Sequence, residues 1–126
     1  MIRLPEFLMG RHLEYPLTLE LALNAAQLLA AINYLRGVYG KPLTVSSGYR
    51  PGHFNKRAGG AKNSSHLTCE AIDIADPDGK FGEWCLANLH HLEHANLYLE
   101  NPAYTPGWAH LQARRPVSGN RVFIPR

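Results

Sequence analysis

The sequence predicts an α+β domain in which a small, largely antiparallel sheet packs with two main helices. Two long segments carry apolar residues at helical spacing, and short apolar runs separated by glycine and proline turns lie between and after them. Helices and strands do not alternate as regular βαβ repeats, so a parallel sheet is not expected. A chain of 126 residues is long enough to bury a core, and we expect residues 1–126 to form a single domain.

The N-terminal third of the chain is predicted to be helical. A short helical turn is expected around Phe7 and Leu8, and Thr18 is a suitable N-cap for a long helix that ends near Gly37 and Gly40. Five apolar residues recur along this helix at helical spacing: Leu21, Ala25, Leu28, Ile32 and Leu35. We interpret the helix as scaffold.

Short strands and turns make up the middle of the chain. Residues 43–46 form a predicted strand that enters a glycine- and proline-rich turn at 48–52. A short helix is expected over residues 53–61, where two glycines end it. After the following loop, a strand is centred on Ile72.

The second long helix is expected over residues 80–95, after a turn at 76–79 that offers an N-terminal cap. Its apolar residues cluster on one side of the helix: Phe81, Trp84, Cys85, Leu89, Leu92 and Ala95. Three more strands are predicted after it, over residues 97–99, 108–112 and 121–124.

Composition and charge limit the classes to which the chain can belong. A hydrophobic content of 45% and a charged content of 18% are ordinary for globular proteins, so disorder is not expected. The net charge of +3 suits an anionic polymer, such as a cell wall or a nucleic acid, without identifying either. Two cysteines, Cys69 and Cys85, give no disulfide framework and fit a reducing compartment.

Membrane and secretion signals are not recognised in the sequence. No apolar run is long enough for a membrane span, and the start of the chain lacks the charged, hydrophobic and small-residue regions of a signal peptide. We therefore expect a protein that is made in the cytoplasm without a signal peptide and that has no membrane partner.

Three residues with metal-binding side chains suggest a zinc site on the sheet. His66, Asp73 and His110 would supply two imidazoles and one carboxylate, a set that suits zinc better than magnesium or calcium. Strand alternation directs Asp73 and His110 away from their aliphatic neighbours, so the two residues meet if their strands are adjacent. The alternative is that Asp73 caps a turn and that both histidines are ordinary hydrogen-bonded residues.

The order of these residues matches a known pattern. The chain has Ser-Gly-Tyr-Arg at residues 47–50, then Ser-Ser-His ending at His66, Asp73 seven residues later, and His110 on a late strand. This order resembles the zinc peptidases of bacterial cell-wall peptides, which include D-alanyl-D-alanine carboxypeptidases and dipeptidases and L-alanyl-D-glutamate endopeptidases. The similarity covers about residues 17–112, and the compact layout resembles the small bacteriophage members.

The resemblance implies a zinc-dependent peptidase, such as a phage endolysin, that hydrolyses D-amino-acid-containing bonds in peptidoglycan stem peptides. One zinc ion per chain would be held by His66, Asp73 and His110, and would lower the pKa of a bound water. Arg50 would hold a substrate carboxylate or stabilise the oxyanion, and Ser64 would line the substrate pocket or orient a ligand. Arg50 paired with loop carbonyls and Ser64 as plain loop material are the structural alternatives. We expect a monomer that acts on the wall after release or within a phage particle.

Two positions depart from the family pattern. The family commonly places an acidic general base three residues before the last histidine, and this chain has Gly107 there. Glu100 is our candidate for a replacement base, and a solvent-exposed strand end is the alternative. Cys69 stands where the family often has a small residue such as glycine. We expect it to be packed in the core, with zinc ligation by its thiolate as the alternative.

Three other interpretations are open. The sequence from His90 to His94 fits the H-x-x-E-H pattern of inverted zinc peptidases, but both histidines are expected on the solvent side of their helix. Without a general base, the chain would be a catalytically weak or inactive, zinc-binding cell-wall module such as a phage structural component. A nucleic-acid binder is disfavoured because the arginines near the C-terminus lack interleaved aromatic residues: Arg114, Arg115, Arg121 and Arg126.

Overall fold

The computed structural model describes residues 1–125 and confirms the α+β fold class. Within these residues one sheet has the strand order β1-β2-β4-β3-β5. The strands are β1 (Val45–Ser47), β2 (Ala71–Asp76), β3 (Tyr98–Glu100), β4 (Gly107–Gln112) and β5 (Val122–Phe123). Neighbouring strands are antiparallel except β3 and β5, which pair in parallel. The sheet is therefore largely antiparallel, as predicted.

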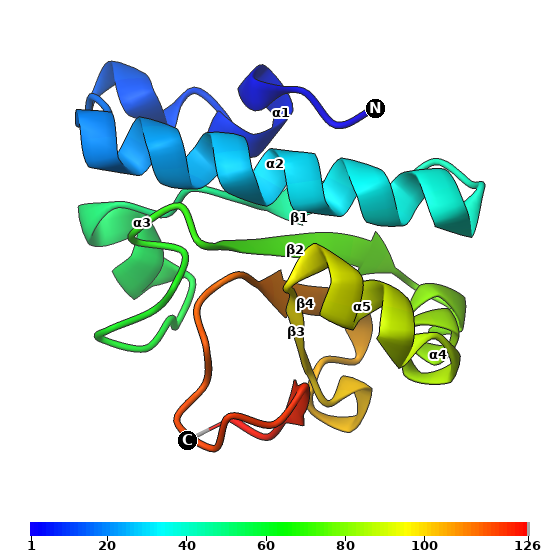
Figure 1. The fold of residues 1–126 in the computed structure, drawn as a ribbon. Coiled ribbons are helices and arrows are strands. Elements are labelled where there is room, and N and C mark those ends of the chain that lie inside the picture. The colour runs from blue at the N-terminus through cyan, green and yellow to red at the C-terminus, as the bar shows by residue number, and fades with distance from the viewer. Residues whose placement is uncertain (126) are drawn as a thin grey trace.

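Five α-helices and two 3₁₀-helices accompany the sheet in the described residues. They are α1 (Leu4–Leu8), η1 (Arg11–Leu13), α2 (Leu19–Tyr39), α3 (Gly52–Arg57), α4 (Lys80–Ala87), α5 (Leu89–Ala95) and η2 (Pro102–Tyr104). Figure 1 shows α2 running along one side of the sheet, while the C-terminal segment lies away from it on the other side. No helix within residues 1–125 combines the length and the apolar character needed to cross a bilayer.

Helix α2 is held to the sheet by the predicted apolar stripe. The side chain of Thr18 accepts a hydrogen bond from the Leu21 N–H group at 3.2 Å, which confirms the N-cap, and Gly40 ends the helix with a φ of +79°. The fully buried residues of the stripe are Ala25, Leu28, Ile32 and Leu35. They belong to one core cluster with Ile72, Ile74, Leu99 and Leu111 of the strands. Because this face of the sheet is covered, the polar residues of the strands lie on the opposite face.

The second long helix is divided in two, contrary to the prediction of one continuous helix. Asn88 separates α4 from α5 with φ −132° and ψ 43°, and its side-chain amide donates to the Trp84 carbonyl at 2.8 Å. An asparagine side chain competes in this way with the helical hydrogen bonds of the backbone. The predicted cap is confirmed, because the Asp76 carboxylate accepts from the N–H groups of Phe81 at 3.0 Å and Gly82 at 2.8 Å.

Most other elements lie within one or two residues of their predicted positions. Strand β1 begins at Val45 and strand β3 at Tyr98, each slightly later than expected. Helix α3 is shorter than predicted because it ends at Arg57, before Gly59, whose φ is +72°. The last strand is limited to Val122–Phe123.

The strand register brings five residues into one row across the sheet. Ser47 pairs with Asp73, and Asp73 pairs with His110. The register of β3 with β4 continues to Glu100 opposite His110, and Glu100 pairs with Phe123 of β5. Cross-strand neighbours project from the same face of a sheet, so this transverse row lies on the face opposite α2. The row joins five strands into one potential site.

Helix α1 supports the turn that follows β1. Phe7 is fully buried, and its carbonyl oxygen accepts from the Tyr49 N–H group at 3.1 Å. A Cβ atom on Gly48 would collide with this carbonyl oxygen and would lie 2.8 Å from the Phe7 ring. The close approach of α1 to the turn therefore requires glycine at position 48.

We predict that Gly48→Ala lowers the free energy of unfolding by about 1–3 kcal/mol, because the added methyl group overpacks the contact with Phe7. Urea unfolding followed by circular dichroism measures the change. Gly37→Ala is the matched control: Gly37 lies inside α2 with no atom near its Cβ position, so alanine should stabilise the protein by about 0.5–1 kcal/mol. An unchanged urea midpoint for Gly48→Ala would contradict the close approach.

Candidate metal centre

His66, Asp73 and His110 converge in the structure, as predicted. One potential ligand atom from each residue lies within 4.8 Å of the other two. His66 Nε2 is 3.3 Å from Asp73 Oδ2, and His110 Nδ1 is 2.9 Å from Asp73 Oδ1. The His66 side chain is fully buried, whereas the other two side chains are slightly exposed. The cluster is therefore accessible from one side.

The backbone of the Ser-Gly-Tyr-Arg turn orients His66. His66 Nδ1 lies 2.8 Å from the Gly48 carbonyl oxygen, which can only accept, so Nδ1 carries the proton and Nε2 presents its lone pair. The Arg50 N–H group donates to the His66 carbonyl at 3.1 Å, and Ser64 Oγ accepts from the His66 N–H group at 3.2 Å. The turn and the loop thus hold this histidine from both sides.

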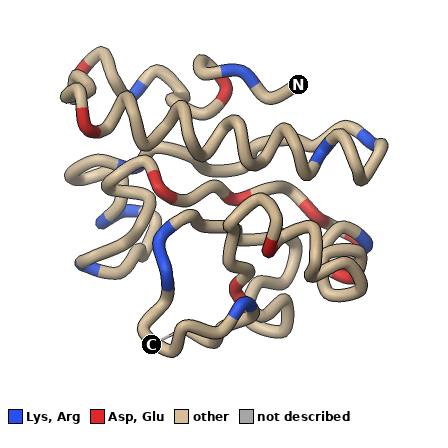
Figure 2. Tube along the Cα trace, in the orientation of Figure 1, with Lys and Arg blue, Asp and Glu red and all other residues tan. Residues whose placement is uncertain are grey.

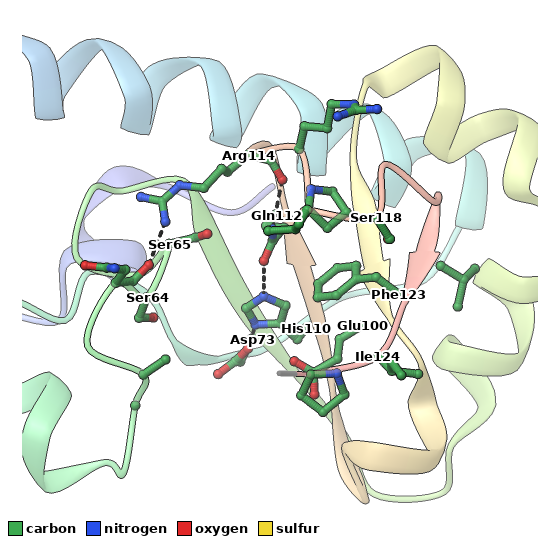
Figure 3. A pocket seen from close by; sticks show the side chains of 18 of the residues that line it. Ser64, Ser65, Asp73, Glu100, His110, Gln112, Arg114, Ser118, Phe123 and Ile124 are labelled. Atoms are coloured by element: carbon green, nitrogen blue, oxygen red, sulfur yellow. Dashed lines mark hydrogen bonds and ion pairs between the residues drawn. The ribbon is translucent and has the colours of Figure 1, made fainter.

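Gln112 orients His110 in the opposite tautomer. The side-chain amide of Gln112 donates to the Arg114 carbonyl at 2.8 Å, so its Oε1 atom faces His110 Nε2, also at 2.8 Å (Figure 3). Because an amide oxygen only accepts, His110 Nε2 carries the proton. Nδ1 of His110 lies 2.9 Å from Asp73 Oδ1, so it donates to the carboxylate when the imidazole is protonated and presents a lone pair there when the imidazole is neutral.

The arrangement fits a cation. With both histidines neutral, two nitrogen lone pairs point at the Asp73 carboxylate, which is itself an acceptor. His66 Nε2 is buried and has no hydrogen-bond partner among the described residues, a costly state for a polar atom. Two imidazole nitrogens and one carboxylate oxygen match the ligand set of a catalytic zinc site. The residues present therefore fit a zinc ion.

Protons stabilise the cluster when no metal is bound. Burial favours a higher pKa for Asp73, but hydrogen bonds and charges from His110 and His66 hold the pKa of this carboxyl well below its ordinary value. Burial also opposes protonation of His110, yet its hydrogen bond to Asp73 and the charge of Asp73 raise the pKa of His110. Burial lowers the pKa of His66, against the opposing effect of Asp73. The contact with Asp73 therefore favours protonation of His110, whereas burial disfavours protonation of His66.

A cavity of about 980 Å³ opens beside the cluster. Loop residues 58–65, mostly glycine, alanine and serine, form one wall, and residues 114–125 form the other. Five of the predicted site residues line this cavity: Arg50, Ser64, Asp73, Glu100 and His110. Figure 3 shows Asp73, His110 and Glu100 together at its base. The residues predicted to bind substrate therefore line the same cavity as two of the predicted metal ligands.

Arg50 presents an unused guanidinium to this cavity. Its Nε atom is buried without a hydrogen-bond partner among residues 1–125, and its side chain makes no hydrogen bond to a loop carbonyl there. Burial lowers the pKa of Arg50, and the negative charge of Asp73 partly offsets this effect. The structural alternative, a pairing with loop carbonyls, is not what the described residues show.

Glu100 is partly buried in the cavity and does not stand at a fully exposed strand end. It follows His110 in the transverse row, and Figure 3 shows its carboxylate beside that histidine. Burial raises the pKa of Glu100, the charge of Asp73 raises it further, and the charge of His110 opposes both effects. A carboxylate in this environment suits proton transfer.

Gly107 and Cys69, the two positions that depart from the family pattern, both have positive φ angles. Gly107 has a φ of +91° at the start of β4, a conformation that a glutamate rarely adopts. Cys69 has a φ of +60° and is fully buried, and burial raises the pKa of its thiol to about 12. Cys69 is therefore a core residue, as expected, and the alternative of a thiolate zinc ligand is not supported.

The H-x-x-E-H motif does not form a metal site within residues 1–125. His90 and His94 are exposed on α5, as expected, and are not part of the converging group found among residues 1–125. Two of the C-terminal arginines are bonded to backbone carbonyl groups, while Arg115 is exposed. Arg114 donates to the Asn63 carbonyl at 2.6 Å, and Arg121 donates to the Leu97 carbonyl at 2.9 Å. Arg126 lies outside the described residues.

Sequence reasoning missed three residues of the site. Gln112 lies two residues after His110 and so shares its strand face, which is a signal for a contact, but the sequence does not predict its hydrogen bond. Gly48 acts through its carbonyl group, which no side-chain pattern reveals. Phe123 reaches the site through the parallel pairing of β5 with β3, for which the sequence carries no local signal.

Comparison with known proteins gives one match. A family model described as Peptidase M15 matches residues 9–103, which are most of the chain. The matched range includes Arg50, His66, Asp73 and Glu100 and ends before His110. No curated protein and no solved structure matches the chain.

We predict that Gln112→Met weakens zinc binding about 10–100-fold, because His110 loses the acceptor that sets its tautomer. Competition with a chromophoric zinc chelator measures the dissociation constant. Gln112→Glu keeps an acceptor oxygen and should bind zinc nearly as well as the unmutated protein. Gln27→Met, at an exposed position of α2, is the matched control. Equal zinc affinity in Gln112→Met and the control would refute the role of the amide.

Zinc affinity should also depend on pH. The pKa of His110 is raised, so its Nδ1 atom must lose a proton before it can bind metal at mildly acidic pH. The apparent zinc affinity should therefore fall about tenfold for each pH unit below that raised pKa. The same chelator assay, repeated over a pH series, tests this. A constant affinity across the series would show that His110 is not a ligand.

Proposed function

Because the chain belongs to the Peptidase M15 family, whose members are zinc-dependent peptidases, we propose that it cleaves D-amino-acid-containing peptide bonds in peptidoglycan stem peptides. The observation that carries the proposal is the convergence of His66, Asp73 and His110 beside a large cavity that Asp73 and His110 line. Hydrogen bonds from Gly48 and Gln112 orient the two histidines, and when both are neutral each can offer one nitrogen to a metal near Asp73. This preorganised ligand set supports a metallopeptidase.

The metal ligands would be His66 through Nε2, His110 through Nδ1 and Asp73 through a carboxylate oxygen, with one zinc ion per chain. When bound, zinc supplies a Lewis acid that polarises a carbonyl and lowers the pKa of a water. Ser64 contributes to this set by accepting from the His66 N–H group, which holds the loop in place. Its hydroxyl also lines the cavity, where it can contact a substrate.

Arg50 would bind the anionic part of the substrate. Its guanidinium is half-buried in the cavity and lacks a protein partner at Nε, so its hydrogen-bonding capacity is available. A fixed guanidinium in a partly desolvated site stabilises a carboxylate or the oxyanion of a tetrahedral intermediate. Its position in the cavity with Asp73 and His110 supports either role.

Glu100 would act as the general base in place of the missing carboxylate at position 107. The attacking water would give its proton to the Glu100 carboxylate, which would then pass the proton to the leaving amine. The raised pKa of Glu100 favours this transfer near neutral pH. Its place next to His110 in the transverse row supports the assignment.

A second candidate function is a zinc-binding cell-wall module without activity, such as a phage structural component. Gly107 is the observation that favours it, because the usual position of the base has no side chain. The two functions differ only in whether Glu100 reaches the water. Turnover therefore decides between them.

We predict that the zinc-loaded protein releases new stem-peptide termini from purified peptidoglycan, and that His66→Ala does not. Mass spectrometry of the products identifies the bond. Glu100→Gln should lower kcat by about 10²–10⁴-fold, because a carboxamide cannot accept the proton. Its zinc content should stay unchanged.

Glu93→Gln, at an exposed position of α5, is the control for Glu100→Gln and should keep full activity. Full activity in Glu100→Gln would refute the base assignment. Unchanged peptidoglycan after incubation with protein that carries one zinc ion would refute the peptidase proposal and favour the wall-binding module.

A further inference from the structure

Positive charge is concentrated on one side of the molecule. Between Glu20 and Glu70 the sequence has six lysine and arginine residues and no carboxylate, whereas residues 76–93 have four carboxylates and one lysine. Figure 2 shows the cations of α3 and of the loop after it gathered near those that follow β4. The net charge of +3 therefore understates the charge of this side.

Arg11 of η1 joins the cations of α3 across the fold. Its Cζ atom lies 4.9 Å from the centroid of the Phe54 ring, and the Cζ atom of Arg57 lies over the same ring at 5.4 Å. Arg11 Nη1 also donates to the Tyr49 carbonyl at 2.8 Å, which fixes the side chain. Burial lowers the pKa of Arg11, and the positive charges of Arg50 and Arg57 lower it further. The guanidinium groups are therefore held close enough to repel one another.

Asn55 holds the loop after α3 in place. This residue is buried, its side-chain amide donates to the Ala61 carbonyl at 3.0 Å, and its own carbonyl accepts from the Gly60 N–H group at 2.9 Å. A Cβ atom at Gly60 would collide with Asn55 Oδ1, so the loop packs directly on the asparagine. The position of Lys62, which comes next in the chain, is therefore set by these contacts.

Arg11, Lys56, Arg57 and Lys62 form a basic surface without counter-charges. The last three are exposed, and Arg11 is half-buried. No carboxylate of residues 1–125 forms an ion pair with any of the four, in contrast to Arg114, which lies 3.3 Å from Glu70. Cations clustered in this way create a positive potential that attracts a polyanion. The surface therefore has its full charge available for a ligand.

The aromatic rings at this surface are already in use. Besides the two guanidinium groups, the Phe54 ring contacts the His53 ring, with centroids 4.4 Å apart, and the Tyr15 ring, at 6.1 Å. Tyr15 and His53 are also joined by a hydrogen bond of 2.8 Å. Proteins that bind single-stranded nucleic acids offer free aromatic rings on which bases stack. The basic surface can therefore bind phosphates but offers no ring to a base.

We propose that this basic surface binds a phosphodiester polymer that carries no bases, such as a polyol phosphate chain. Successive phosphates of one polymer would contact the four cationic side chains through charge-assisted hydrogen bonds. Residues beside Arg57 and Lys62 in the chain line the cavity, so a bound polymer would pass the mouth of the cavity. The inference goes beyond the proposed function, because binding at this surface requires neither a zinc ion nor turnover.

The test compares two labelled oligomers that share one phosphodiester backbone of about 12 phosphates. One is oligothymidylate, and the other has abasic sites throughout. Fluorescence anisotropy on the full, zinc-loaded chain gives each dissociation constant between about 50 and 200 mM salt. Both affinities should fall as the salt concentration rises. The two oligomers should bind within about twofold of each other, because no free ring is available for stacking.

Arg57→Gln and Lys62→Gln each remove one charge from the basic surface. Each should reduce the slope of log affinity against log salt concentration by about 0.7, the value for one lost phosphate contact on a single strand. Arg3→Gln and Lys80→Gln are the matched controls, since they remove the same charge at exposed positions elsewhere and should leave the slope unchanged. All four variants should keep the zinc affinity of the unmutated protein, which separates lost phosphate contacts from damage to the metal centre.

Equal salt slopes in the surface variants and the controls would overturn the inference, because binding would then follow net charge alone. Oligothymidylate that binds about tenfold tighter than the abasic oligomer would also overturn it and would indicate a nucleic-acid partner. Displacement of the oligomer by inorganic phosphate at the same total phosphate concentration would indicate a site for a single anion and contradict a polymer. Binding of the abasic oligomer without hydrolysis of peptidoglycan would support the surface and count only against the peptidase proposal.

Discussion

The register between β2 and β4 is the constraint on which the rest of the site depends. Side chains alternate between the two faces of a strand, so a slip of one residue would bury Asp73 and His110 and expose the aliphatic residues beside them. Ile72 and Leu111 pair across the same two strands and pack in the core beneath α2. Because burying an unpaired charge is costly, the core that selects this register also sets the geometry of the candidate metal centre.

The two histidines are prepared for a metal by different means. A backbone carbonyl, that of Gly48, sets the tautomer of His66, while a side-chain amide, that of Gln112, sets the tautomer of His110. The Ser-Gly-Tyr-Arg turn thus acts largely through its backbone, and its glycine is required because α1 packs directly on it. Arg50, the last residue of the turn, is left free to face the cavity. Residues 47–50 therefore orient the candidate ligand His66 and also supply Arg50, the proposed substrate contact.

In the transverse row, the carboxylate that we propose as general base lies on β3, whereas the family pattern has it on the strand of the last histidine. A carboxylate at position 107 would belong to β4, but the backbone there has a φ that favours glycine. Glu100 of β3, which we propose as the base, lies beside His110 and lines the same cavity. Phe123 extends the row by one more strand, so residues beyond the matched family range complete the cavity.

The sequence by itself determined the features that depend on local patterns. The α+β class, the α2 stripe, the caps at Thr18 and Asp76 and the candidate ligand set follow from spacing, capping chemistry and motif order. Only the tertiary structure decided the break at Asn88, the position of Glu100 beside His110, and the contacts of Gln112 and Phe123. The positions of Glu100 and Phe123 arise from contacts between segments that are distant in the chain, and such contacts depend on strand order and register, which no local pattern encodes. The hydrogen bonds of Asn88 and Gln112 involve near neighbours in the chain, but the packing around these side chains decides whether they form.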